Sequence, residues 1–267
     1  MDAQLAAVAT LVAHTRSWRA HRTGRPGFRA LTAFRHSRDV FIDSPVGLVI
    51  PGHENYQPRS VRRWLDYFPR FRARDLRIGV VGGVIRDEQL SDRAQMATFS
   101  PFAFTAVDLR GRGTAWVAER VPTVGKAREQ GLWAIRFRRV EDASLSPARS
   151  VTEATATLTA AIRACYEFAE GERALRQWQP FFAEALEVLA GTIPHSGDVL
   201  PVKGYREDAL RLTAAAHTAW VLGDIMSWTD HQPTSSRARV VHRALTAELY
   251  AALIEAVIAS VNEGLAS

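Results

Sequence analysis

The chain has 267 residues, enough to bury a sizeable core as one large domain or two small ones. With 47% hydrophobic and 23% charged residues it has the composition of a soluble globular protein, and no continuous apolar run reaches the roughly 18 residues of a membrane span. The single cysteine, Cys165, excludes an internal disulfide and a cysteine-rich zinc site. Asp2 precedes the first apolar run and the basic residues follow it, the wrong order for a secretory signal, so we expect a cytoplasmic protein without a membrane anchor.

The charge is unevenly distributed along the chain. Residues 1–150 carry a net charge of +11 and residues 151–267 carry −5, which together give the overall +6. All basic residues except Lys126 and Lys203 are arginine. A basic first half can mark an anionic partner or attraction between the halves. An arginine-rich composition can also be the bias of a GC-rich, bacterial-type genome.

The first half predicts a mixture of helices and strands. Residues 2–20 predict an amphipathic helix with apolar side chains at helical spacing. Residues 46–50 and 76–84 are short, continuously apolar runs that predict buried strands, and residues 60–68 between them predict a helix. This order of strand, helix and strand favours one βαβ unit with parallel strands.

Further strands follow before the middle of the chain. Residues 97–109 and 114–121 flank a glycine-containing link, which predicts a hairpin, and residues 131–140 predict another strand. We therefore predict an N-terminal mixed sheet of α+β or α/β class over residues 1–145.

The second half predicts a bundle of about four helices over residues 150–267. Its start is marked by a polar, proline-containing stretch and by the capping-box pattern of Ser150 and Glu153. The helices are expected at 151–170, 173–190, 205–230 and 240–262. We expect this domain to pack tightly on the first.

The segment 205–230 is apolar on nearly every face, which predicts the buried central helix of the bundle. His217 and Asp224 interrupt its main stripe seven residues apart, about 10 Å along a helix, so both could contact one ligand. A hydrogen-bonded core histidine is the structural alternative. With Asp230 and His231 they could also form a metal site, but their spacing matches no known metal motif, so we predict no metal.

Polar residues follow the two strands of the predicted βαβ unit: His53, Glu54 and Tyr56 after the first, and Arg86 and Asp87 after the second. Ligands of open α/β sheets bind beyond the carboxyl ends of the strands. His53, with the carboxylates Glu54 and Asp87, would supply catalytic groups, and Arg86 would anchor an anion. Tyr56 would contact the ligand, as would His217 and Asp224 from the helical half.

Two classes of function follow from these patterns. In the first, the protein binds an anionic small molecule at the strand ends and could act on it as an enzyme, with a reaction and a cofactor that the sequence does not identify. In the second, it is a non-catalytic interaction protein whose basic N-terminal half docks an acidic protein or a nucleic acid. Arginines interleaved with aromatic residues, as at 62–64, are compatible with single-stranded nucleic acid. Arginine also stacks on aromatic rings within a protein, so nucleic acid is not favoured.

Overall fold

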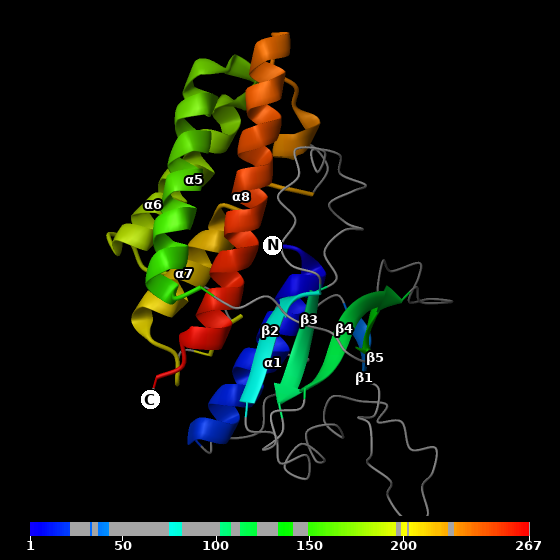
Figure 1. Ribbon diagram of the computed structural model, residues 1–267. Coiled ribbons are helices and arrows are strands. Elements are labelled where there is room, and N and C mark those ends of the chain that lie inside the picture. The colour runs from blue at the N-terminus through cyan, green and yellow to red at the C-terminus, as the bar shows by residue number, and fades with distance from the viewer. Residues whose placement is uncertain are drawn as a thin grey trace, which may run out of the picture. The chain divides into compact units, whose positions relative to one another are not determined.

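The structure is a computed structural model of the chain. It describes residues 1–21, 33, 37–42, 75–81, 102–107, 113–121, 133–140, 149–195, 199–201, 203–223 and 227–266. The described elements form two compact units, one of a helix with a sheet and one of helices alone (Figure 1). The predicted α+β class, with a helical second half, is confirmed.

The first unit contains a five-stranded mixed sheet. Its strands are β1 (Ser37–Ile42), β2 (Asp75–Val80), β3 (Phe102–Val107), β4 (Gly113–Val121) and β5 (Trp133–Val140), in the order β1-β5-β4-β3-β2. β1 and β5 are parallel, and every other neighbouring pair is antiparallel. The predicted hairpin is confirmed as β3 and β4, in which Phe104 lies opposite Trp116.

The predicted βαβ unit is only partly within the described residues. Its second strand is β2, which pairs with β3 in the antiparallel direction. Its first strand, 46–50, and its helix, 60–68, lie outside the described ranges. Parallel pairing between those two strands therefore stays a prediction.

Helix α1 (Ala3–His21) packs against β2, β3 and β4. The expectation of an amphipathic helix here is wrong, because every residue from 5 to 13 is buried. On the sheet, the Phe104 ring stacks on Trp116 with centroids 5.0 Å apart and meets Phe137 edge-on at 5.5 Å. Such aromatic contacts add to the burial of apolar area that holds the unit together.

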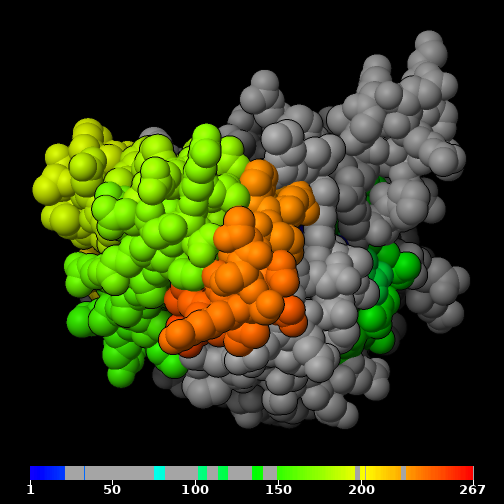
Figure 2. Space-filling view, turned by 90° about the horizontal axis from the view of Figure 1, so that it is seen from above, coloured from blue at the N-terminus to red at the C-terminus, as the bar shows by residue number. Residues whose placement is uncertain are grey.

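The second unit is a four-helix bundle. It consists of α5 (Val151–Gly171), the 3-10 helix η5 (Arg173–Trp178), α6 (Gln179–Ala190), α7 (Glu207–Thr218), the 3-10 turn η6 (Trp228–Asp230) and α8 (Ser236–Glu263). The four α-helices pack in the order α5, α6, α7, α8 and back to α5, and α5 also makes a smaller contact with α7. Figure 2 shows one end of this bundle. There the orange surface of η6 and of the first turns of α8 lies beside the green surface of the α5–α6 region.

The prediction of one central helix from 205 to 230 is wrong. α7 ends at Thr218, and the chain continues through Gly223, whose φ of 88° is incompatible with an α-helix. Trp228 then returns to the core, where its indole N–H donates to the Thr246 hydroxyl at 2.8 Å. Apolar residues on all faces are equally suited to a buried helix and to a buried irregular segment, so periodicity could not separate the two.

The helix that is buried on nearly all sides is α8. It contains an 18-residue window of mean hydropathy 1.7, of which 78% is buried inside the protein. By length and composition this helix could cross a membrane, but the core helix of a bundle has the same properties. The expectation that the protein has no membrane anchor stays a prediction.

Candidate functional site

Most of the predicted site lies outside the described part of the chain. This holds for His53, Glu54, Tyr56, Arg86, Asp87 and Asp224. Whether they converge at the strand ends therefore stays a prediction. His217 is described, and it lies exposed on the last turn of α7.

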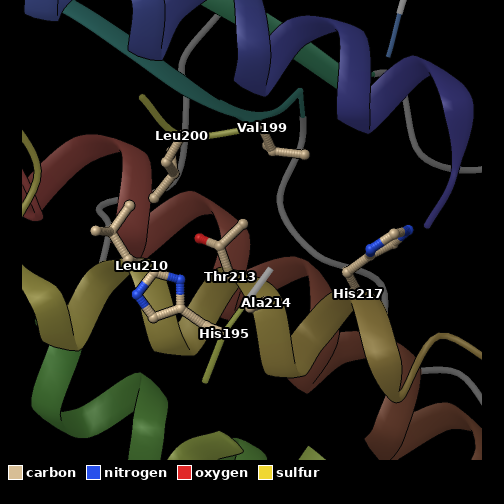
Figure 3. Close-up of a pocket in the computed structure, with 7 residues that line it drawn as sticks. All are labelled: His195, Val199, Leu200, Leu210, Thr213, Ala214 and His217. Carbon is tan, nitrogen blue, oxygen red and sulfur yellow. The ribbon is translucent and has the colours of Figure 1, made fainter. Parts of the chain in front are cut away.

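His217 lies at the rim of a hollow in the helical unit (Figure 3). The hollow is shallow: its cavity volume is about 20 Å³, and the wider space of about 290 Å³ includes open solvent. Its lining residues are His195, Val199, Leu200, Leu210, Thr213, Ala214 and His217. It thus lies between α7 and the segment that connects α6 to α7.

The local sequence explains how this hollow forms. α6 ends at Gly191, whose φ of 74° reverses the chain into the connecting segment. On α7, the four lining residues are spaced three and four apart, which places them on one face of the helix. Leu210 and His217 mark the two ends of that face, about 10 Å apart by helix rise. Figure 3 shows Val199 and Leu200 opposite this face.

Thr213 lies at the middle of the hollow and is only 4% exposed. Its Oγ1 has no hydrogen-bond partner among the described residues. Other threonines in the described helices donate to the carbonyl four residues earlier, as Thr155 does at 2.8 Å and Thr246 at 2.6 Å. A buried hydroxyl without a partner costs about 1–3 kcal/mol. Thr10 of α1 also lacks a described partner but is completely buried, whereas Thr213 borders an open hollow.

The charges beside the hollow are already paired with one another. The Nε2 atom of His195 lies 3.2 Å from one carboxylate oxygen of Glu207, and Nε of Arg211 lies 3.3 Å from the other. Glu207 is therefore shared by two basic groups. None of the residues that line the hollow is acidic.

Of the four residues considered for a metal site, Asp230 and His231 make structural hydrogen bonds, His217 lines the hollow, and Asp224 lies outside the described residues. Asp230 accepts the backbone N–H of Ser227 at 3.0 Å and so caps η6. His231 is within hydrogen-bond distance of Ser227 O at 3.0 Å and of the Gln177 side chain at 2.9 Å. Within the described ranges, no cluster of three or more histidine, cysteine or acidic side chains could hold a metal ion.

Two reactive side chains are enclosed in the bundle, away from this hollow. His242 is 3% exposed, and burial lowers its pKa to about 4, an effect that the hydrogen bond to the Trp228 backbone opposes. Its ring lies 4.8 Å from that of Trp228. Burial raises the pKa of the Cys165 thiol to about 12. Both groups are neutral and shielded at physiological pH, so we assign them to the core.

Sequence reasoning identified His217 but missed Thr213 and the connecting segment. The helical spacing of Leu210, Ala214 and His217 already indicated that they share one face of α7. Thr213, among small apolar residues, gave no such indication.

No protein-family model matches the chain, and no curated protein or solved structure shows significant similarity to it. The hollow on α7 is therefore the candidate site on its geometry alone.

Proposed function

We propose that this protein binds a small molecule in the hollow on α7. The observation that carries the proposal is the Thr213 hydroxyl, which is buried beside an open hollow and has no hydrogen-bond partner in the described structure. A ligand group bonded to Thr213 would remove the cost of leaving it unsatisfied.

The other lining residues suit a ligand that has both apolar and polar groups. Leu200 and Leu210 offer apolar surface, and the imidazoles of His195 and His217 offer polar contacts. Small-molecule sites combine an apolar lining with a few polar groups in this way. The anchored carboxylate of Glu207 holds His195 at the edge of the hollow.

A thermal-shift panel of small organic acids, amines, alcohols and sugars tests the proposal. A ligand at 100 times its Kd stabilises the folded state by about 2.7 kcal/mol, a shift of several degrees for a chain of this size. Thr213→Val removes the hydroxyl with little change in shape and should abolish the shift, whereas the matched control Thr213→Ser should retain it. A silent panel, or a hit that Thr213→Val leaves unchanged, would contradict the proposal.

A further inference from the structure

The first turns of α8 present two apolar side chains to solvent. Val240 is 57% exposed and Val241 is 40% exposed, and they are two of the three large apolar side chains that the described part of the chain exposes. The other side of the same turns is fixed in the core, where His242 is 3% exposed and its ring lies 4.8 Å from that of Trp228. The valines are therefore held on the outside of the bundle, on the orange surface seen in Figure 2.

Arginines flank these valines on the surface of the helix. Arg237, Val240, Val241 and Ala244 are spaced three and four residues apart and so share one face. Arg243 follows Val240 by three residues and lies beside it, on the side away from Val241. Both arginines are exposed, and neither belongs to an ion pair of the described residues. We call these five residues the α8 stripe.

The charge of this region is opposite to that of the helical half around it. Residues 231–247 contain three of the nine arginine and lysine residues of 151–267 and none of its fourteen acidic residues. The first turn of α8 has no acidic residue, although the positive end of a helix dipole favours one. Arginines at this end oppose the dipole, so acidic groups from a partner would stabilise it.

The exposed valines distinguish a protein from other anionic partners. Nucleic acids bind through phosphate charge and through bases that stack on aromatic rings, and the stripe has no aromatic residue. Helices that lie on anionic membranes insert a wide apolar face rich in tryptophan, phenylalanine or leucine, whereas here the wide apolar face is buried in the bundle. A two-fold dimer through the stripe would place arginines against arginines.

We infer that the α8 stripe docks an acidic amphipathic helix of a partner protein. Apolar side chains of that helix pack along Val240, Val241 and Ala244, as in other complexes in which a helix binds to an apolar surface. Its carboxylates pair with Arg237 and Arg243 at the flanks. This inference goes beyond ligand binding in the hollow on α7, because the stripe shares no residue with the lining of the hollow.

Fluorescence anisotropy with a labelled 18-residue peptide tests the inference. The probe carries leucines at helical spacing on one face and glutamates on the others. We expect it to bind the full chain at least ten times more tightly than a scrambled peptide of the same composition, which has no apolar face, and than a version with lysine for glutamate. Binding should weaken when the salt concentration is raised, because the ion pairs at an exposed surface are screened.

Substitutions locate the binding on the stripe. The double variant Val240→Ser, Val241→Ser should weaken the acidic peptide about tenfold, since the peptide then buries less apolar area. It should keep its fold, because both side chains are largely exposed. Arg237→Ala should weaken the peptide about fivefold, while the matched control Arg163→Ala, which removes an exposed arginine of α5, should change its affinity less than twofold.

Three results would overturn the inference. They are no binding of the acidic peptide, equal binding of the scrambled peptide, and equal affinity of the wild type and the double valine variant. A single-stranded oligonucleotide and phosphatidylserine vesicles are measured in parallel. If either binds in a manner that requires Arg237 and the acidic peptide does not bind, the surface takes nucleic acid or membrane and the protein partner is wrong.

Discussion

The Tyr205 hydroxyl donates to the Val261 carbonyl at 3.2 Å and so joins the start of α7 to the last turn of α8. The contact continues beyond the two helices. The Arg206 N–H donates to Gly264 O at 2.9 Å, and the Ala266 N–H donates to Gly204 O at 2.9 Å. The end of the chain thus holds the helix that forms one wall of the hollow.

This contact requires glycine at position 264. A Cβ atom there would lie 2.3 Å from Ser260 O and 2.3 Å from the Ala209 Cβ, closer than real atoms approach. We expect Gly264→Ala to lower the free energy of unfolding of the helical unit by about 2 kcal/mol or more, because the backbone of α8 or of α7 must shift. Urea unfolding followed by circular dichroism measures this loss.

Gly171, the last residue of α5, provides the matched control. A Cβ atom there meets nothing within 4 Å, so Gly171→Ala should leave stability unchanged or raise it by up to about 1 kcal/mol. Equal effects of the two substitutions would show that the contact between α7 and the chain end is not as tight as described.

The capping box at the start of α5 is a second testable feature. Ser150 Oγ accepts the Glu153 N–H at 3.2 Å, and the Glu153 carboxylate accepts the Ser150 N–H at 3.0 Å. We expect Ser150→Ala to cost about 1 kcal/mol in thermal or urea unfolding, as such caps typically do. Thr152→Ala, at an exposed position of the same turn, should cost much less. A loss at Thr152 as large as that at Ser150 would contradict the capping role.

The Ser150 hydrogen bonds also lower the pKa of Glu153 below its ordinary 4.5. A carboxyl group whose pKa is lowered by folding stabilises the protein at every pH above the pKa that the group has in the unfolded chain. This stabilisation is lost as the pH falls through the pKa of the group in the folded protein. The difference in stability between wild type and Ser150→Ala should therefore shrink in acid. A difference that grows below pH 4 would count against this pairing.

His242, a buried base, also makes the stability of the protein depend on pH. Because its pKa falls from 6.5 to about 4 on folding, the unfolded chain binds more protons between these values. Stability should therefore be unaffected by this group above pH 6.5 and decrease as the pH falls from 6.5 to 4, by about 3 kcal/mol in total.

Urea unfolding at pH 7.5, 5.5 and 4.5 measures this effect, with His242→Gln as the comparison. Glutamine does not titrate, and it keeps a donor for the Trp228 backbone. The wild type should lose more stability between pH 7.5 and 4.5 than the variant does. If the wild type and His242→Gln lost the same stability between pH 7.5 and 4.5, His242 would not be held neutral by burial.

The fold was predictable where local patterns are strong. The hairpin of β3 and β4, predicted from two strand-like runs joined by a glycine-containing link, and the Ser150–Glu153 capping box each depend on residues close in sequence. The structure confirms both. The end of α7 at Thr218 was not predictable, because a helix and a buried turn both use apolar residues. The positive φ of Gly223 shows that the chain turns here instead of continuing as a helix. Glycine adopts both helical and positive-φ conformations, so its presence in the sequence does not decide between them.

The candidate site was predictable in part. His217 was identified because a polar residue interrupts an apolar stripe, and this signal lies within one helix. The other wall comes from Val199 and Leu200, in a loop whose position depends on how α6 and α7 pack. Thr213 could not be separated from core threonines, since most of those hydroxyls bond to their own helix, and only the three-dimensional structure shows that Thr213 does not.

The central claim is that a ligand occupies the hollow on α7, and methyl-detected NMR tests it most directly. Titration of the labelled protein with the tightest compound of the panel should shift the methyl signals of Leu200, Leu210, Thr213 and Ala214 and give nuclear Overhauser effects between them and the ligand. The methyls of Val151 and Ile162, buried on α5, should stay unchanged and serve as the internal control. Shifts confined to residues outside the hollow, or no shifts at saturating ligand, would contradict the account.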